Sequence, residues 1–174
     1  ILGVIFITAC KATTVTQWQN LAPGIDYTVL DLDQGKLHAF KIDLKQNRLG
    51  LLSPSEPNDI KDMVINARAL LGVNAGFFTP DGKPLGLRIN DGKMLSPLKP
   101  ISWWGIFYLR NGTPELSSAN SFKLNNDIDF AVQAGPRLLV NKDIPHLKDG
   151  VGNRTAIGYN QNNDVIIAVS ENAQ

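Results

Sequence analysis

Apolar residues recur at every second position in two neighbouring stretches near the start of the chain. The runs IDYTVLDL (25–32) and KLHAFKIDL (36–44) alternate in this way, and Asp33-Gln34-Gly35 joins them. A period of two is typical of strands, and a short link containing glycine is typical of a hairpin. From Val73 onward, short apolar runs alternate with Gly, Asn, Asp and Pro turns. We expect strands at LGLRI, WWGIFYL, DFAVQA, RLLV, TAIGY and DVIIAVS.

One segment has a helical period instead. NDIKDMVINARALL (58–71) places five apolar residues on one helical face, with Asn58 or Asp59 available as the N-cap. These residues are Ile60, Met63, Val64, Ala67 and Leu71. RLGLLS (48–53) is the candidate for one more short strand. The sequence therefore predicts an α+β fold, mainly antiparallel β-sheet, with one clear helix at about 58–71.

The first ten residues, ILGVIFITAC, form an apolar run that ends at the only cysteine of the chain, Cys10. The run is too short to span a bilayer, which takes ~20 apolar residues. It fits the apolar section of a secretory signal, and small residues before a cysteine resemble the cleavage box of bacterial lipoproteins. We expect a signal over 1–10, lipid on Cys10, a tether over 11–24 and a domain over 25–174. A buried first strand with an incidental cysteine is the alternative.

These expectations place the mature protein on the bacterial cell envelope. Lys11, rather than an aspartate, follows the lipidated cysteine and favours the outer membrane. The 174 residues, 43% of them hydrophobic, are enough for one core. With 17 basic and 16 acidic residues spread along the chain, no basic tract indicates nucleic-acid binding. His38 and His146 are far apart and lack ligand-type neighbours, so we expect neither a metal nor a cofactor.

Three segments combine glycine with a polar side chain at the end of an apolar run. They are NAGFF (74–78) with PLG (84–86), QAGPRLLV (133–140) and NRTAIGYN (153–160). Arg154 offers a planar fork that suits paired phosphate oxygens, and Asn74 and Gln133 offer neutral amides for sugar or phosphate oxygens. Each segment alone is better explained by structural roles, namely glycines in turns and an arginine paired with a surface carboxylate.

Taken in order, the motifs resemble those of the phosphodiester glycosidase family. The order is Asn-x-Gly-Phe-Phe, Pro-x-Gly before a strand and Asp-Gly, Gln-x-Gly-Pro-x-Leu, then Arg-Thr-Ala-Ile-Gly, and the resemblance runs from about 18 to 169. It implies hydrolysis of the bond between a sugar's anomeric carbon and a phosphodiester oxygen of an envelope or extracellular glycan. Ala75 departs from the family's glycine, and the sequence stops before a Leu-Asp-Gly-Gly-type segment. We therefore expect an incomplete C-terminus and a missing catalytic carboxylate.

The resemblance also implies roles for individual residues. Arg154 would neutralise the phosphate, and Asn74 would orient the substrate. His38 is a candidate acid or base, although an inward histidine bonded to a backbone carbonyl is favoured. Asp81 is a candidate carboxylate, although a turn role is favoured. The substrate-binding set comprises Gly76, Phe77, Gly86, Gln133, Gly135 and Thr155.

Two other functions stay open at this point. The first is a non-catalytic envelope lipoprotein that binds phosphorylated or phosphodiester-linked carbohydrate in the same cleft. The second is a periplasmic scaffold in which SWWGIFYL (102–109) packs against a partner. Trp103 and Trp104 suit either a core or a sugar-stacking platform, and the core is favoured.

Overall fold

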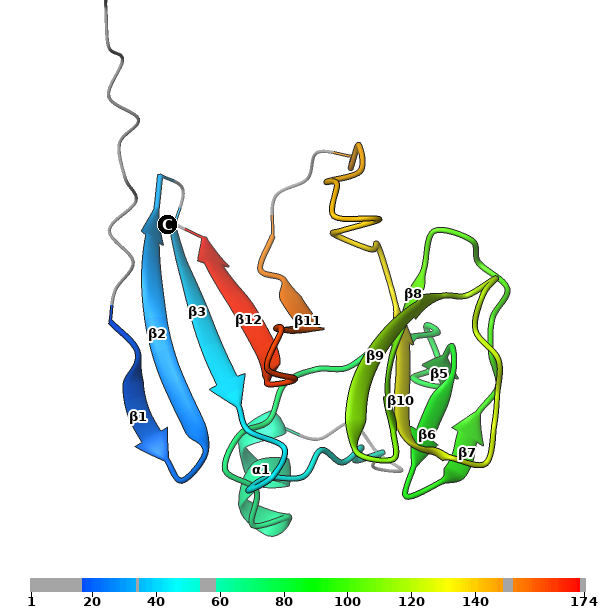
Figure 1. Cartoon of the computed structure of the whole chain (residues 1–174), viewed down its shortest axis with the longest axis horizontal. Coiled ribbons are helices and arrows are strands. Elements are labelled where there is room, and N and C mark those ends of the chain that lie inside the picture. Colours follow the sequence, from blue (N-terminus) through cyan, green and yellow to red (C-terminus); the bar gives the residue numbers. More distant parts are fainter. Residues whose placement is uncertain (1–16, 34, 54–58, 149–151, 173–174) are drawn as a thin grey trace, which may run out of the picture.

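Two five-stranded antiparallel sheets lie side by side, with one short helix beneath them in the view of Figure 1. This computed structural model describes residues 17–33, 35–53, 59–148 and 152–172. The signal expected over 1–10, including Cys10, lies outside the described residues. The mainly antiparallel β architecture predicted from the sequence is confirmed.

The first sheet has the order β1-β2-β3-β12-β11. Its strands are β1 (Gln19–Ala22), β2 (Ile25–Leu32), β3 (Gly35–Ile42), β12 (Val165–Asn172) and β11 (Thr155–Tyr159). The predicted hairpin is confirmed as β2 and β3, which pair from Ile25 with Ile42 to Leu32 with Gly35. The stretch expected as a tether includes β1, because Gln19 and Asn20 pair with β2 instead of standing free.

The second sheet has the order β7-β6-β10-β8-β9. Its strands are β7 (Lys93–Ser96), β6 (Arg88–Asn90), β10 (Ile128–Ala134), β8 (Gly105–Arg110) and β9 (Thr113–Ser118). A separate small hairpin pairs β4 (Phe77–Phe78) with β5 (Pro84–Leu85). Pro114 is tolerated in β9 because that strand lies at an edge of the sheet.

Alternate residues of both sheets build one shared core cluster. Val165 and Ile167 of β12 pack there with Phe107 of β8 and Val132 of β10. Because side chains alternate along a strand, these residues define an inner face of each sheet. A second cluster, on the other side of β6, β8 and β10, contains Leu87, Ile89, Ile106 and Ala131.

Three predicted elements differ in the structure. Helix α1 covers only Ile60–Asn66, capped by Asp59, and Arg68 at φ 51° leaves the helical region. It has no buried residue, so little packing favours further turns. No helix in the described part of the chain has the length and apolarity to cross a membrane.

The two leucine-rich runs are not strands either. In 48–53, the Leu51 N–H donates to the Asn90 side chain at 2.8 Å instead of to a neighbouring strand. In 137–140, Leu138 and Leu139 are exposed, and Val140 forms an isolated bridge with Asp143 instead of joining a sheet. High leucine content alone therefore did not place these segments in a sheet.

Candidate functional site

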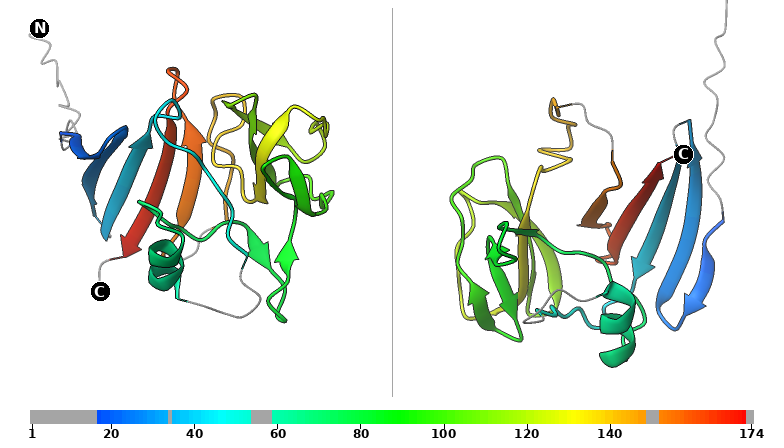
Figure 2. Two further views of the ribbon diagram at one scale, coloured as in Figure 1. Left: turned by 90° about the horizontal axis from the view of Figure 1, so that it is seen from below. Right: turned by 180° about the vertical axis from the view of Figure 1, so that it is seen from behind.

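Residues 73–76, the crossing segment, connect the two sheets. The chain leaves α1 and runs toward the β4–β5 hairpin, as Figure 2 shows. On one side, the Thr155 hydroxyl at the start of β11 donates to the Asn74 Oδ1 at 2.7 Å. On the other, the Arg88 guanidinium of β6 donates to the Ala75 carbonyl at 3.2 Å. Two consecutive residues thus contact opposite sheets.

Gly76 in the crossing segment and Gly86 beyond it are needed for close packing. Gly76 has φ 71°, and a Cβ there would lie 3.3 Å from the Gln133 carbonyl. Gly86 has φ 108°, and its Cβ would lie 3.2 Å from the Gln133 side chain and 3.3 Å from Trp104. Side chains other than hydrogen are disfavoured at such positive φ values.

Gln133 is a structural residue, which corrects its expected role in binding substrate. Its side chain is 1% exposed. Its Oε1 accepts from the N–H groups of Leu87 at 2.9 Å and Lys99 at 3.0 Å, and its Nε2 donates to the Lys99 carbonyl at 2.6 Å. Through both of its polar atoms, the amide therefore joins β10 to Leu87, which precedes β6, and to Lys99, which follows β7.

Gly135 lies under the two tryptophans. A Cβ at Gly135 would come within 2.5 Å of Trp104 and 2.9 Å of Trp103, so no larger residue fits without movement. Trp104 is buried, as the favoured core interpretation predicts, and Phe77 packs on it with ring centroids 4.8 Å apart. Trp103 is 55% exposed, which corrects that interpretation for this residue.

Arg154 precedes Thr155 at the start of β11 and is exposed. Its backbone N–H donates to the Ser170 hydroxyl at 2.8 Å, and its Nη1 donates to the Asn153 carbonyl at 3.1 Å. Among the residues that the structure describes, no carboxylate forms an ion pair with it. The structure thus joins Thr155 to Asn74, from two distant motifs, and Arg154 precedes Thr155 in the chain.

Arg88 is a cation near this group that the sequence analysis did not single out. Its guanidinium is half-buried and donates to the Ser53 hydroxyl at 3.1 Å as well as to Ala75. Burial lowers the pKa of Arg88 from its usual value, and no ion pair with a described carboxylate offsets that burial. Its position one residue after Gly86-Leu87, at the start of a strand, was the available signal.

His38 is held by two side chains, which corrects the expected bond to a backbone carbonyl. Its Nδ1 lies 2.7 Å from the Tyr27 hydroxyl and its Nε2 lies 3.1 Å from the Glu171 Oε2. Glu171 belongs to no recognised motif, and the sequence analysis missed it. The alternation of Val165, Ile167 and Val169 was the available signal, because it continues to Glu171 on the same face.

Asp81 has the turn role that the sequence favours. Its carboxylate bonds Lys83 Nζ at 2.8 Å and accepts from the Thr79 hydroxyl in the β4–β5 loop. The Lys83 hydrogen bond, followed by that of Thr79, lowers the pKa of Asp81. These contacts stabilise the loop and explain the residue without a catalytic role.

The described residues contain no metal-type cluster, and one cavity lies apart from the predicted site residues. Within the described ranges, no three His, Cys, Asp or Glu residues are grouped as they would be around a metal ion. A cavity of about 360 Å³ is lined by Leu44, Arg48, Asp91 and Phe130 among others, and none of the predicted site residues lines it. The polar groups around the crossing segment are therefore the candidate site on chemical grounds, although the cavity lies elsewhere.

Comparison with known proteins adds two findings. A sequence model of the phosphodiester glycosidase family matches residues 67–174, which is more than half of the chain. The uncharacterised protein YigE of Escherichia coli K12 is 27% identical over 126 residues, covering 66% of this chain and 50% of that relative. The chain thus spans about half the length of this curated relative. The matched range contains the crossing segment, Arg88, Arg154 and Glu171, but not Tyr27 or His38.

Proposed function

The chain belongs to the phosphodiester glycosidase family, and on this premise we propose that it hydrolyses the bond between a sugar's anomeric carbon and a phosphodiester oxygen. The observation that carries the proposal is the hydrogen bond between Thr155 and Asn74, with the exposed Arg154 next to Thr155 in the chain. Thr155 and Asn74 are 81 positions apart in sequence, and both segments belong to the motifs that resemble the family. We propose envelope or extracellular glycans as the substrates.

The chemistry needs a group that neutralises the departing phosphate. When the bond between the anomeric carbon and oxygen breaks, its electron pair stays on the phosphate, which leaves as a phosphomonoester. That oxygen is weakly basic, so electrostatic stabilisation matters more than protonation. Arg154 suits this role because its exposed guanidinium can present two N–H groups to phosphate oxygens. Asn74, oriented by Thr155, would hold a sugar hydroxyl or another phosphate oxygen through its Nδ2.

Glycan binding without hydrolysis is a second candidate function. It is favoured by Trp103, whose indole is 55% exposed and packs edge-on against the buried Trp104 with ring centroids 5.8 Å apart. An anchored, exposed aromatic ring is a suitable surface for the apolar face of a sugar. Both functions would use the same ligand class, so only a turnover assay separates them.

The test is hydrolysis of a panel of sugar-1-phosphodiesters. The release of the reducing sugar is the measured quantity. The protein would be assayed as wild type and as Arg154→Ala. Arg48→Ala is the matched control, because that arginine is exposed and paired with Asp91 beside the separate cavity. We expect Arg154→Ala to lower kcat/KM about 100-fold or more, and Arg48→Ala to leave it within about twofold.

Two results would overturn the proposal. Equal turnover by wild type and Arg154→Ala would remove the arginine from the reaction. Binding of the panel by a wild type that releases no sugar would instead favour the glycan-binding function.

The lipid anchor on Cys10 and the envelope location also remain proposals. Their support is the apolar run that ends at the single cysteine. Mass spectrometry of the mature N-terminus should find an acylated Cys10, and an unmodified N-terminus upstream of it would contradict the anchor.

A further inference from the structure

Three titratable side chains from three adjacent strands form a continuous chain of hydrogen bonds. The imidazole of His38 on β3 lies between the Tyr27 hydroxyl on β2, at 2.7 Å, and the Glu171 carboxylate on β12, at 3.1 Å. An ionised carboxylate only accepts hydrogen bonds, so the proton of a neutral imidazole lies on Nε2. Nδ1 then accepts from Tyr27. Both hydrogen bonds are satisfied by one tautomer, which orients Glu171.

Strand register places this chain of hydrogen bonds beside Asn74 and Thr155. Thr155 pairs with Val169, and Val169 pairs with His38, so these residues form one row across the sheet. Thr155 and His38 are therefore about 10 Å apart at their Cα atoms, which is two strand spacings. Glu171 lies two residues beyond Val169 on the same face. It is a diagonal neighbour of Thr155, at about 7–8 Å.

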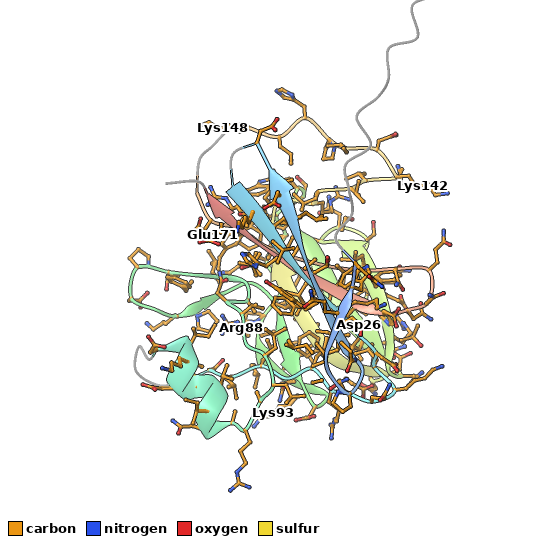
Figure 3. The ribbon with its side chains drawn as sticks, turned by 90° about the vertical axis from the view of Figure 1, so that its left-hand side faces the viewer. Asp26, Arg88, Lys93, Lys142, Lys148 and Glu171 are labelled. Carbon is orange, nitrogen blue, oxygen red and sulfur yellow. The ribbon has the colours of Figure 1, made fainter. Side chains whose placement is uncertain are left out.

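Among the three hydrogen-bonded side chains, Glu171 is the one that reaches solvent. Its side chain is 66% exposed, whereas that of His38 is 28% exposed. Among the described residues, no hydrogen bond is found to its second oxygen, Oε1. The neighbouring charges are Lys36, directly opposite Glu171 on β3, and Asp31, opposite Lys36 on β2. Figure 3 shows Glu171 near one end of β12 and Asp26 toward the opposite end of the sheet.

We infer that Glu171 is a catalytic carboxylate of this site and that His38 and Tyr27 are the residues that position it. This inference rests on the proposed function. Glu171 Oε1 takes a proton from the attacking water, and the water oxygen bonds to the anomeric carbon. The bond from that carbon to the phosphate oxygen breaks, and its electron pair leaves with the phosphomonoester. The proton then passes from Glu171 to solvent.

One carboxylate is sufficient for this scheme. Glycosidases usually need a second carboxyl group to protonate the leaving oxygen. A phosphate oxygen needs no such acid, and the positive charge of Arg154 supplies the stabilisation instead. Glu171 thus fills the role for which the sequence analysis expected a residue beyond the end of the chain.

The test compares variants of the protein in the sugar-1-phosphodiester assay. Glu171→Gln should lower kcat about 100-fold or more while KM stays within about threefold, because only the proton acceptor is lost. Asp26→Asn is the control, since this carboxylate lies in the same sheet but pairs with Lys41 at 2.9 Å. It should retain wild-type kcat.

A matched pair of His38 variants tests positioning. The amide of a glutamine falls near Nε2 and keeps a donor to Glu171, whereas the amide of an asparagine falls near Nδ1 and loses it. We expect His38→Asn to lower kcat about 10-fold. His38→Gln should recover most of this loss, and Tyr27→Phe should cost about threefold in kcat. Equal effects of the two His38 variants would overturn the positioning role.

The outcomes separate the two proposals. If wild type is active and Arg154→Ala is not, but Glu171→Gln keeps more than about a third of wild-type kcat, the carboxylate assignment alone fails. If wild type hydrolyses nothing, the proposed function fails and takes this inference with it. Thermal unfolding of Glu171→Gln should match wild type, because Glu171 is largely exposed.

Discussion

At the scale of single residues, two glycines with positive φ stand in different surroundings. Gly86 has φ 108°, and a Cβ there would lie 3.2–3.3 Å from Gln133 and Trp104. Gly82 has φ 77° in the β4–β5 loop, and a Cβ there would meet no atom within 4 Å. Both positions disfavour alanine through backbone strain, but only Gly86 adds a steric cost. This pair separates the two effects.

We expect Gly86→Ala to lower the free energy of unfolding by about 2–4 kcal/mol, and Gly82→Ala to lower it by about 1 kcal/mol. The difference reflects contacts with a buried amide and a buried indole, neither of which moves freely. Urea denaturation of the two variants and wild type measures both values. Equal losses would show that backbone strain alone requires glycine at residue 86.

At the scale of elements, a polar cluster ties β8 to its neighbours. The Tyr108 hydroxyl donates to Glu115 on β9, and Arg110 donates to Glu115 at 3.0 Å and to Asp127 before β10. Burial, followed by the bond to Glu115, raises the pKa of Tyr108 above its ordinary 10.0. The cluster therefore favours the protonated phenol in the folded state.

This shift predicts a loss of stability in alkali. Above pH 10.0 the unfolded chain ionises this tyrosine while the folded chain keeps it protonated, so unfolding releases a proton and becomes easier as the pH rises. Between pH 10 and the folded pKa, wild type should lose up to about 1.4 kcal/mol per pH unit from this group. Tyr108→Phe should lack this contribution. Urea denaturation at pH 9 and pH 11 tests it, and parallel pH dependence in the two proteins would contradict it.

Elements with a strong alternating pattern were predictable, and those without one were not. The β2–β3 hairpin follows from its period of two, which coincides with the buried positions Ile25, Ala39 and Ile42. Strands β7 and β9 were missed because they are edge strands with mostly polar or exposed residues. The helix was predicted too long because the apolar residues of 58–71 share one helical face, but α1 has no buried residue and little packing stabilises further turns.

At the scale of the whole molecule, the candidate site depends on contacts between distant segments. The motifs indicated Asn74, Thr155 and Arg154, and the structure joins Thr155 to Asn74 through a hydrogen bond across 81 positions. The His38–Glu171 contact spans 133 positions and involves no motif. The alternation along β12 indicates which face Glu171 occupies, but not that His38 lies beside it. Gln133 illustrates the opposite case, because a motif residue proved to support the backbone.

The shared core predicts that both sheets unfold together. Phe107 of β8 is 2% exposed and packs in the cluster that also contains Ile42 and Val165 of the first sheet. Phe107→Ala should therefore lower the free energy of unfolding by about 3–5 kcal/mol. The cavity that this substitution leaves would lie in the core shared by both sheets. The slowest-exchanging amides of β3 and β8 should therefore lose the same amount of protection.

Hydrogen exchange followed by mass spectrometry measures this coupling in each sheet separately. Leu124→Ala is the control, because that leucine is 57% exposed in the loop before β10 and should cost less than about 0.5 kcal/mol. A loss of protection confined to β8 and its neighbours would show that the first sheet is stable without the second. The site would then join two independent units, and its geometry would depend on the crossing segment more than on the core.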